Sequence, residues 1–342
     1  MSFNRKIEII DTTMRDGDHA VSHCFSPEDA ARLAEGLDRA GVSFLEVGHG
    51  DGLAGSSIQY GFSRHPEEHL HRAVVRVLKR SKLCVLLLPG IGTIEELRAA
   101  HEIGAGAARI ATHCTEADIS EQHIDLAKKL GMTSIGALMM VHMIPPQDLA
   151  VQAKLMESYG ADIIYYMDSA GALLPQQVRE RLQAAKDVLK VPIGFHAHNN
   201  LSLAVANELA AVEAGAEYLD GCLRGLGAGS GNAQIEVLAA VLEKAGIETG
   251  VDLYTLMDTA EQVLVPLMKR PQVIDNASLI LGYAGVYSSF LLHTFRAAEK
   301  FNVDFRDVLV ELGRRKTVGG QEDWIIEVCA EMAGLARSRT HP

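Results

Sequence analysis

Short apolar runs alternate with amphipathic stretches from residue 7 to about residue 245. A strand-length apolar run predicts a buried β-strand, and apolar residues at every third or fourth position predict a helix with one buried face. The eight runs are 7–10, 44–47, 83–88, 108–111, 135–141, 163–167, 192–195 and 218–223. The stretches with helical spacing include 27–40, 94–103, 119–130, 147–159, 175–188, 201–214 and 233–245. Ser26 and Pro27 supply a helix cap and a first-turn proline, and several of the stretches end at glycine.

Eight repeated strand–helix units without a hairpin signal predict a parallel sheet. The first run leads into Asp11-Thr12-Thr13-Met14-Arg15-Asp16, which lacks the glycines of a phosphate-binding loop. This favours closure into a (β/α)8 TIM barrel over an open doubly wound sheet. From about Val251 the pattern is helical throughout. We therefore expect a catalytic barrel domain over residues 1–250 and a C-terminal helical domain over residues 251–342.

Composition narrows the classes of partner. The chain has 342 residues, of which 48% are hydrophobic and 22% charged, as in a globular protein. Its net charge of −12 argues against binding to nucleic acid, which requires a basic face. No apolar stretch reaches the length of a membrane span, and the N-terminus carries no signal-peptide core. The five cysteines are scattered, which is typical of free thiols in the cytoplasm.

Polar residues collect where the expected strands end. The seventh run ends in His196-Ala197-His198, and residues i and i+2 of a strand face the same side. Asp16 follows the first run, and all strand ends of a barrel share one rim. Two imidazoles and a carboxylate suit Mn²⁺, Co²⁺, Mg²⁺ or Fe²⁺ better than zinc. A His-x-His pair alone is more often a polar surface pair or a satisfied core pair, so the prediction of a metal depends on Asp16 as well.

Three further residues near these positions offer chemistry. Arg15 could stabilise an enolate oxygen, or it could form a salt bridge with a neighbouring aspartate. His19 could act as an acid or base near neutral pH, or it could be a polar residue beside a helix. Asn232 ends the glycine-rich run 225–232 and offers another oxygen donor, although turns alone explain several of those glycines. Spacing does not decide these roles.

The chain resembles the 4-hydroxy-2-oxovalerate aldolases, which are class II pyruvate aldolases within the wider group of HMG-CoA-lyase-like barrels. The wider group shares the Asp-Thr-x-x-Arg-Asp-Gly of the first strand and the His-x-His pair. The segments that carry the resemblance are 11–20, 48–53, 194–201, 225–232, 281–290 and 318–323. They are spread over nearly the whole length of the chain. One departure is His-Ala-His-Asn-Asn, where the family often has His-Gly-His-His-Asn, so the preferred aldehyde is expected to differ.

The resemblance implies that Asp16, His196 and His198 bind Mn²⁺, with Co²⁺ or Mg²⁺ as substitutes. The substrate implied is 4-hydroxy-2-oxovalerate or a related 4-hydroxy-2-oxoacid from the meta-cleavage catabolism of aromatic compounds. Its carboxylate and keto oxygens would bind at the ion. The residues implied in substrate binding are Arg15, Asp16, Ser169, His196 and Tyr287.

The resemblance also implies a reversible cleavage. His19 takes the proton of the C4 hydroxyl, the C3–C4 bond breaks, and acetaldehyde and the enolate of pyruvate form. Arg15 stabilises the enolate and Tyr287 orients the C4 substituent. We also expect Leu86 and Leu88, at the end of the third strand, to shape the aldehyde pocket.

Members of this family pair with an acylating acetaldehyde dehydrogenase, to which the aldehyde passes through a tunnel. The resemblance therefore implies such a partner for the C-terminal helical domain. The main alternative is an acyl-CoA-dependent Claisen condensation, as in homocitrate and isopropylmalate synthases, but the narrower motifs favour the aldolase. A non-haem Fe(II) oxygenase conflicts with the eight strand–helix units, and a non-catalytic scaffold would leave the full set of polar residues unexplained.

Overall fold

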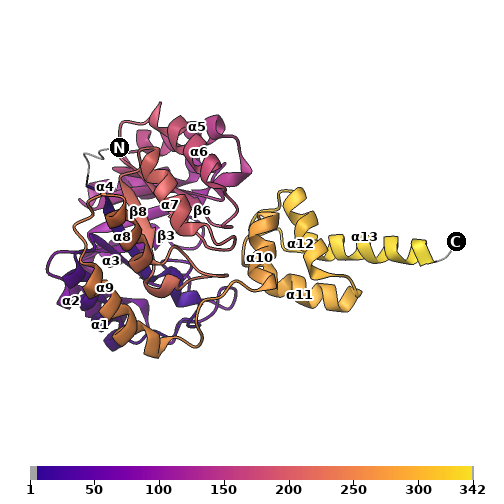
Figure 1. The fold of residues 1–342 in the computed structure, drawn as a ribbon, viewed down its shortest axis with the longest axis horizontal. Coiled ribbons are helices and arrows are strands. Elements are labelled where there is room, and N and C mark those ends of the chain that lie inside the picture. Colours follow the sequence, from indigo (N-terminus) through magenta and orange to yellow (C-terminus); the bar gives the residue numbers. More distant parts are fainter. Residues whose placement is uncertain (1–5, 341–342) are drawn as a thin grey trace.

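The barrel consists of eight parallel strands that pair in chain order. The structure is a computed structural model that describes the main chain of residues 6–340 and the side chains of residues 6–334. β1 pairs with both β2 and β8, which closes the sheet (Figure 1). The strands are β1 Glu8–Met14, β2 Phe44–Val47, β3 Lys82–Leu87, β4 Ala107–His113, β5 Thr133–Met139, β6 Ile163–Asp168, β7 Ile193–Ala197 and β8 Tyr218–Gly221. The predicted (β/α)8 barrel is confirmed.

One principal helix follows each strand and covers the outside of the sheet. These helices are α1 Pro27–Ala40, α2 Glu67–Val77, α3 Ile94–Ile103, α4 Glu121–Lys129, α5 Pro146–Ser158, α6 Pro175–Lys186, α7 Ala204–Glu213 and α8 Ile235–Lys244. The Ser26 side chain accepts a hydrogen bond from the backbone of Asp29, and α1 ends at Gly41 with φ of 92°. The predicted cap and glycine stop are therefore confirmed. α2 is the barrel helix that the predicted stretches did not include.

Seven of the eight strands end one to four residues away from the predicted position, among them β1 and β5. β1 continues to Met14, so the polar Asp11-Thr12-Thr13 segment is strand rather than loop. Strand pairing explains this, because Met14 is in register with Val47 of β2. The Asp11 carboxyl group accepts hydrogen bonds from both the backbone and the hydroxyl of Thr13. β5 ends at Met139, before the predicted Val141, because Met140 has a left-handed φ of 56°.

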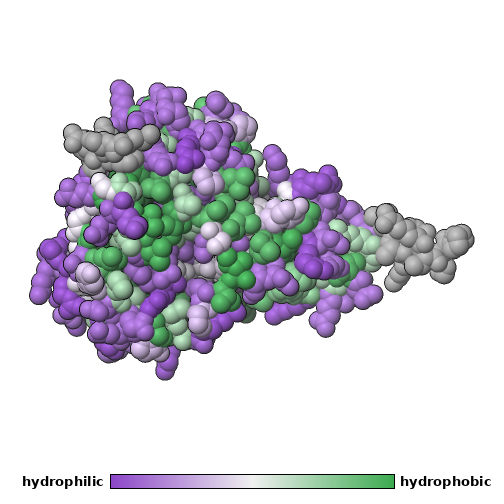
Figure 2. All heavy atoms as spheres, viewed as in Figure 1, coloured by the Kyte–Doolittle hydropathy of each residue, from purple (hydrophilic) through white to green (hydrophobic). Residues whose placement is uncertain are grey.

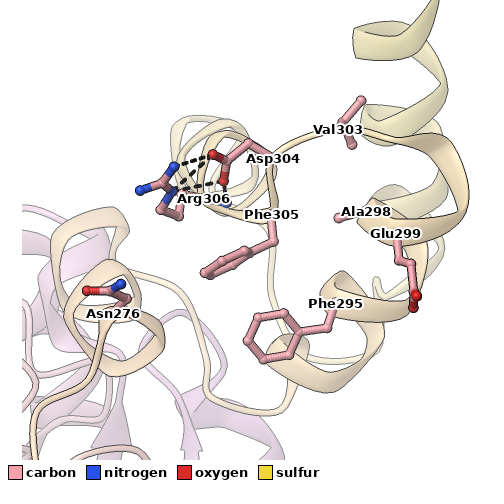
Figure 3. Close-up of a pocket in the computed structure, with 8 residues that line it drawn as sticks. All are labelled: Asn276, Phe295, Ala298, Glu299, Val303, Asp304, Phe305 and Arg306. Atoms are coloured by element: carbon pink, nitrogen blue, oxygen red, sulfur yellow. Dashed lines mark hydrogen bonds and ion pairs between the residues drawn. The ribbon is translucent and has the colours of Figure 1, made fainter.

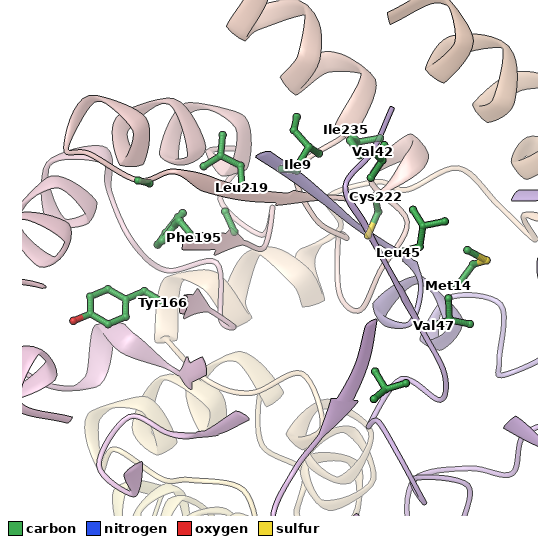
Figure 4. Packing of buried hydrophobic residues seen from close by; sticks show 14 of the residues in the cluster. Ile9, Met14, Val42, Leu45, Val47, Tyr166, Phe195, Leu219, Cys222 and Ile235 are labelled. Carbon is green, nitrogen blue, oxygen red and sulfur yellow. The ribbon is translucent and has the colours of Figure 1, made fainter. Parts of the chain in front are cut away.

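Side chains alternate between the inside of the barrel and the layer under the helices. On β6, Tyr165 and Met167 belong to the inner apolar cluster, whereas Ile164 and Tyr166 belong to the outer one. Phe195 of β7 also packs in the outer cluster (Figure 4). The alternation therefore turns Gly194 and His196 of β7 toward the barrel axis.

The C-terminal part is helical. α9 (Leu253–Thr259) packs on α1, and its Leu256 lies in the outer core of the barrel. The remaining helices, α10 Asn276–Ala284, α11 Phe290–Phe301, α12 Phe305–Arg314 and α13 Asp323–Thr340, have a separate apolar core. α10 lies nearest the barrel and α13 points away from it (Figure 1). The division at residues 250 and 251 stays a prediction.

Helix α10 approaches the barrel closely at a glycine. A Cβ on Gly282 would lie 2.9 Å from the Cβ of Asn200 and 3.1 Å from the carbonyl oxygen of Gly171. These residues belong to the loops that follow β7 and β6. The helical part therefore rests directly on the carboxyl-end rim of the barrel. None of the helices within residues 6–340 is long and apolar enough to cross a membrane.

Candidate active site

Two histidines and an aspartate lie at the carboxyl ends of β7 and β1, the two strands that flank β8. His196 is near the end of β7, His198 follows it directly, and their ring centroids are 5.0 Å apart. Asp16 lies just after β1. All three side chains are buried. The structure therefore brings the three predicted ligands to one part of the rim.

Asp16 is held by donors on both of its carboxyl oxygens. Arg15 Nη1 donates to Oδ1 at 2.9 Å, and Asn232 Nδ2 donates to Oδ2 at 2.6 Å. Burial alone would raise the pKa of Asp16, but Arg15 and the neighbouring imidazoles hold it well below its usual range. A Cβ on Gly227 would lie 2.4 Å from Asp16 Oδ2, so the loop after β8 can make this approach only with glycine.

The hydrogen bond to Asp220 decides which nitrogen of His196 carries the proton. His196 Nδ1 lies 2.9 Å from Asp220 Oδ2. Burial would raise the pKa of Asp220, but Arg109 and His196 lower it to about 2, so it is ionised and accepts. His196 Nδ1 is then the donor, and Nε2 keeps its lone pair. Burial lowers the pKa of His198 to about 4, which leaves this imidazole neutral at neutral pH.

The donor set fits a divalent cation. His196 Nε2 and Asn232 Oδ1 are buried acceptors without a hydrogen-bond partner, and such atoms are rare unless a ligand or water serves them. Neutral imidazoles and an ionised carboxylate are the forms that bind metal. In the described part of the chain, no three His, Cys, Asp or Glu side chains are already grouped to hold an ion. The two carboxyl oxygens of Asp16 accept hydrogen bonds from Arg15 and Asn232.

A buried ion-pair network lies behind these residues, and the sequence analysis missed it. Arg109 of β4 contacts Glu46 of β2 and Asp220 of β8. Glu46 also contacts Arg15 Nε at 2.6 Å. The signal was present, since each of these charged residues lies among apolar neighbours within a strand. The sequence does not show which of them pair across the barrel.

His19 lies in a group of three imidazoles. It ends the short 3-10 turn Asp16–His19, and its ring centroid is 5.3 Å from that of His23 and 6.3 Å from that of His49. A Cβ on Gly50 would lie 2.4 Å from the His19 ring, so the loop after β2 covers this side chain closely. Burial, His23 and His19 lower the pKa of His49 to about 4, so His49 is neutral at neutral pH.

The remaining predicted residues lie on other parts of the rim. Ser169, after β6, accepts a hydrogen bond from the backbone of Met140 at 3.3 Å. Tyr287, between α10 and α11, has a raised pKa because it has lost much of its contact with water and lies near Cys114 and Glu116, after β4. Leu86 and Leu88 lie with the inner apolar cluster, at and just after the end of β3.

A separate hollow lies in the helical part. It has a volume of about 390 Å³, and the rings of Phe295 and Phe305 are 4.7 Å apart in it (Figure 3). Its lining residues all belong to the segment 276–306 and include none of the polar cluster.

Two family models match the chain. Residues 6–263 match the HMGL-like family, and residues 272–334 match the DmpG-like communication domain. Two near-full-length relatives are named 4-hydroxy-2-oxovalerate aldolase. The protein of Carboxydothermus hydrogenoformans is 63% identical over 329 residues, which is 96% of this chain and 98% of the relative. That of Moorella thermoacetica is 62% identical over 329 residues, which is 96% of this chain and 97% of the relative.

Solved structures with lower identity share the fold. The carboxyl transferase domain of Rhizobium etli pyruvate carboxylase matches with a TM-score of 0.81 at 18% identity, covering 97% of this chain and 61% of that one. Bacillus subtilis HMG-CoA lyase matches with a TM-score of 0.67 at 22% identity, covering 79% of this chain and 97% of that one.

Proposed function

The chain belongs to the 4-hydroxy-2-oxovalerate aldolases of the HMGL-like family, and from this premise we propose which of its residues carry the reaction. The protein is a metal-dependent lyase of aromatic catabolism that cleaves 4-hydroxy-2-oxovalerate to pyruvate and acetaldehyde. The aldolase reaction is therefore assigned in preference to the acyl-CoA-dependent condensation.

We propose that Asp16, His196 and His198 hold the ion and that the ion is Mn²⁺, with Co²⁺ or Mg²⁺ able to replace it. The observation that carries this proposal is the buried, unpartnered Nε2 of His196 beside an ionised Asp16. A dication bound there supplies Lewis acidity where the keto oxygen of the substrate gains negative charge. The orphaned Oδ1 of Asn232 is a further acceptor that the ion or its water would satisfy.

Arg15 stabilises the enolate in this proposal. Glu46 and Asp16 hold its Nε and Nη1, while its Nη2 is buried without a partner. Nη2 is therefore free to donate to the oxygen of the developing enolate. A fixed donor in a site shielded from water is worth several kcal/mol of transition-state stabilisation, typically about 3.

His19 is the proposed base. It takes the C4 hydroxyl proton while the electrons of the C3–C4 bond move into the enolate, and the aldehyde leaves. C3 of the enolate then takes a proton, which restores the base and gives pyruvate. Ser169 and Tyr287, on neighbouring loops of the rim, would contact and orient the substrate, and Leu86 and Leu88 would line the aldehyde pocket.

We propose that the helical part associates with a dehydrogenase, and its match to the DmpG-like communication domain supports this. We propose that the partner is an acylating acetaldehyde dehydrogenase and that the aldehyde passes directly between the two active sites. Tyr283 of α10 and Leu292 of α11 support this contact, since they are 73% and 66% exposed although apolar. All five cysteines are free thiols, which supports a reducing, cytoplasmic location.

The test is release of pyruvate from 4-hydroxy-2-oxopentanoate, followed with lactate dehydrogenase after chelation and again after Mn²⁺ is restored. We expect activity only with the metal, and at least a tenfold weaker Mn²⁺ dissociation constant for Asp16→Asn and His198→Ala. His69→Ala, an exposed residue of α2, is the control. Equal Mn²⁺ affinity in all four proteins would refute the ligand assignment.

A further inference from the structure

Arg109 is a buried charge for which the proposed reaction has no direct use. It lies in the middle of β4, is fully buried, and shares the inner face of the strand with Ala107 and Ala111. Removing a guanidinium from water is costly, and the cost often exceeds the gain from its ion pairs. Stability alone is therefore a weak reason for an arginine in this place.

The contacts of Arg109 are divided between two carboxylates. Its Nε is 2.9 Å from Glu46 Oε2, and its Nη1 and Nη2 are 2.5 and 3.1 Å from the two oxygens of Asp220. The guanidinium also lies over the ring of Tyr165, with 4.4 Å to the ring centroid. These contacts fix the plane of the guanidinium on three sides.

Each of these carboxylates also holds a residue of the proposed site. Glu46 Oε1 accepts from Arg15 Nε at 2.6 Å, and Asp220 Oδ2 lies 2.9 Å from His196 Nδ1. The buried chain Arg15–Glu46–Arg109–Asp220–His196 therefore crosses the barrel from the enolate-stabilising group to the metal ligand. Without Arg109, two buried carboxylates would lie near each other with no charge between them.

We propose that Arg109 is a positioning residue that serves both halves of the site at once. Through Glu46 it holds Arg15 with Nη2 free for the enolate, and through Asp220 it keeps the proton of His196 on Nδ1, so that Nε2 is available to the ion. The inference rests on the proposed function, because it gives these two residues their roles.

Two variants separate the halves. Asp220→Asn should weaken Mn²⁺ binding by about 10- to 100-fold, as loss of a carboxylate behind a ligating histidine does. Glu46→Gln should leave the Mn²⁺ dissociation constant within about twofold of wild type but lower kcat about tenfold or more. Glu46→Gln should also weaken the binding of oxalate, which is a planar mimic of the pyruvate enolate. Mn²⁺ binding is measured by calorimetry on the chelated protein, so one readout is independent of turnover.

Arg109→Met should produce both defects together. Thr112→Val is the matched control, since Thr112 lies on the same strand, is buried and has no hydrogen-bond partner for its hydroxyl. Circular dichroism checks the fold of each protein. If Arg109→Met does not fold, Arg109→Lys takes its place, since lysine keeps the charge but cannot make the paired N–H contacts of the guanidinium.

Unchanged Mn²⁺ affinity in Asp220→Asn, or equal loss of affinity in Glu46→Gln and Asp220→Asn, would overturn the inference. These outcomes count against the inference alone if His198→Ala still abolishes tight Mn²⁺ binding. If His198→Ala binds Mn²⁺ like wild type, the proposed metal site itself fails, so the two failures are distinguishable.

Discussion

Each candidate ligand in the barrel mouth has the charge state that metal binding needs, for a different physical reason. Asp16 stays ionised despite burial because Arg15 and three imidazoles surround it. His198 stays neutral because burial disfavours its charged form. His196 keeps the lone pair of Nε2 available because Asp220 accepts a hydrogen bond from Nδ1–H on the other side of the ring. The suitability of the site for a dication therefore depends on the residues around the proposed ligands as much as on the ligands themselves.

At this scale we predict that His19→Ala lowers kcat about 100-fold, because the variant has no group at that place to take the hydroxyl proton. Mn²⁺ affinity should be unchanged, since His19 is not among the proposed ligands. Steady-state kinetics and calorimetry on His19→Ala and on the control His69→Ala check both parts. Full activity of His19→Ala would show that another group is the base.

The three proposed ligands could be selected from the sequence because strand alternation puts residues 196 and 198 on one face and the barrel rim adds residue 16. It could not predict the network of Arg109, since an isolated charge in an apolar run does not show its partner. Glu46 and Arg109 are separated by a whole strand–helix unit, and Asp220 by several more. Only closure of the barrel brings them together.

Among the elements, the loop between β2 and α2 is joined to α2 by a carboxyl group. Glu67, the first residue of α2, accepts the backbone N–H of His49 at 3.0 Å. Loss of contact with water raises the pKa of Glu67 to about 7, although the backbone donors oppose the shift. The loop that covers His19 is therefore held by an acid that is half protonated near neutral pH.

This raised pKa predicts a pH dependence of stability. Between the unfolded pKa of about 4.3 and the folded value of about 7, the unfolded chain releases the proton of Glu67 while the folded chain keeps it. Its contribution to stability is thus full below pH 4 and is lost as the pH rises to 7. Relative to wild type, Glu67→Gln should gain on the order of 1 kcal/mol per pH unit between pH 5 and 7.

Urea unfolding of both proteins at pH 5, 6 and 7 measures this difference. Glu68→Gln, its exposed neighbour, is the control and should show a difference from wild type that does not depend on pH. A constant difference for Glu67→Gln as well would mean that Glu67 titrates normally in the folded protein.

The contact of α10 with the barrel gives a second prediction for an element. A methyl group at residue 282 would meet Asn200 and Gly171, so Gly282→Ala should displace α10 from the loops that carry Ser169 and His198. We expect kcat/KM to fall about tenfold and stability to fall by about 1–3 kcal/mol. Gly334→Ala in α13 is the control, since nothing lies within 4 Å of its Cβ position. Equal behaviour of the two variants would mean that α10 tolerates the methyl group.

The order and type of the elements followed from hydrophobic spacing, but their exact ends depended on single residues. β1 extends because Met14 pairs with Val47 of β2, and β5 ends because Met140 has a left-handed φ. The docking of α10 on the rim could not be predicted, because a glycine that permits close approach looks the same in a sequence as one in a turn.

The whole molecule joins a catalytic barrel to a helical part that rests on its mouth. Apolar side chains gather at the surface near this junction (Figure 2). Leu279 of α10 and Ile274, just before α10, are apolar and exposed. The eight repeated units predicted the closed barrel. The packing of the helical part on the barrel depends on tertiary contacts, and no repeating pattern in the sequence predicts these contacts.

For the assembly we predict that Leu292→Asp weakens binding of an acylating acetaldehyde dehydrogenase at least about tenfold, because it places a charge on an apolar surface of the helical part. Val237→Asp, at a 41% exposed position on α8 of the barrel, should bind like wild type. Sedimentation of each variant with the dehydrogenase measures the affinity. Equal binding of the two variants would show that the dehydrogenase does not contact Leu292 of α11.

In our proposal one divalent ion binds between the ends of β1 and β7, and anomalous diffraction at the manganese edge would locate it. Crystals of the wild-type protein grown with Mn²⁺ should show a peak within bonding distance of the Asp16 carboxylate and of Nε2 of His196 and His198. Crystals of His198→Ala grown in the same way should show a weak peak or none. A peak at any other place in catalytically active crystals would contradict the account.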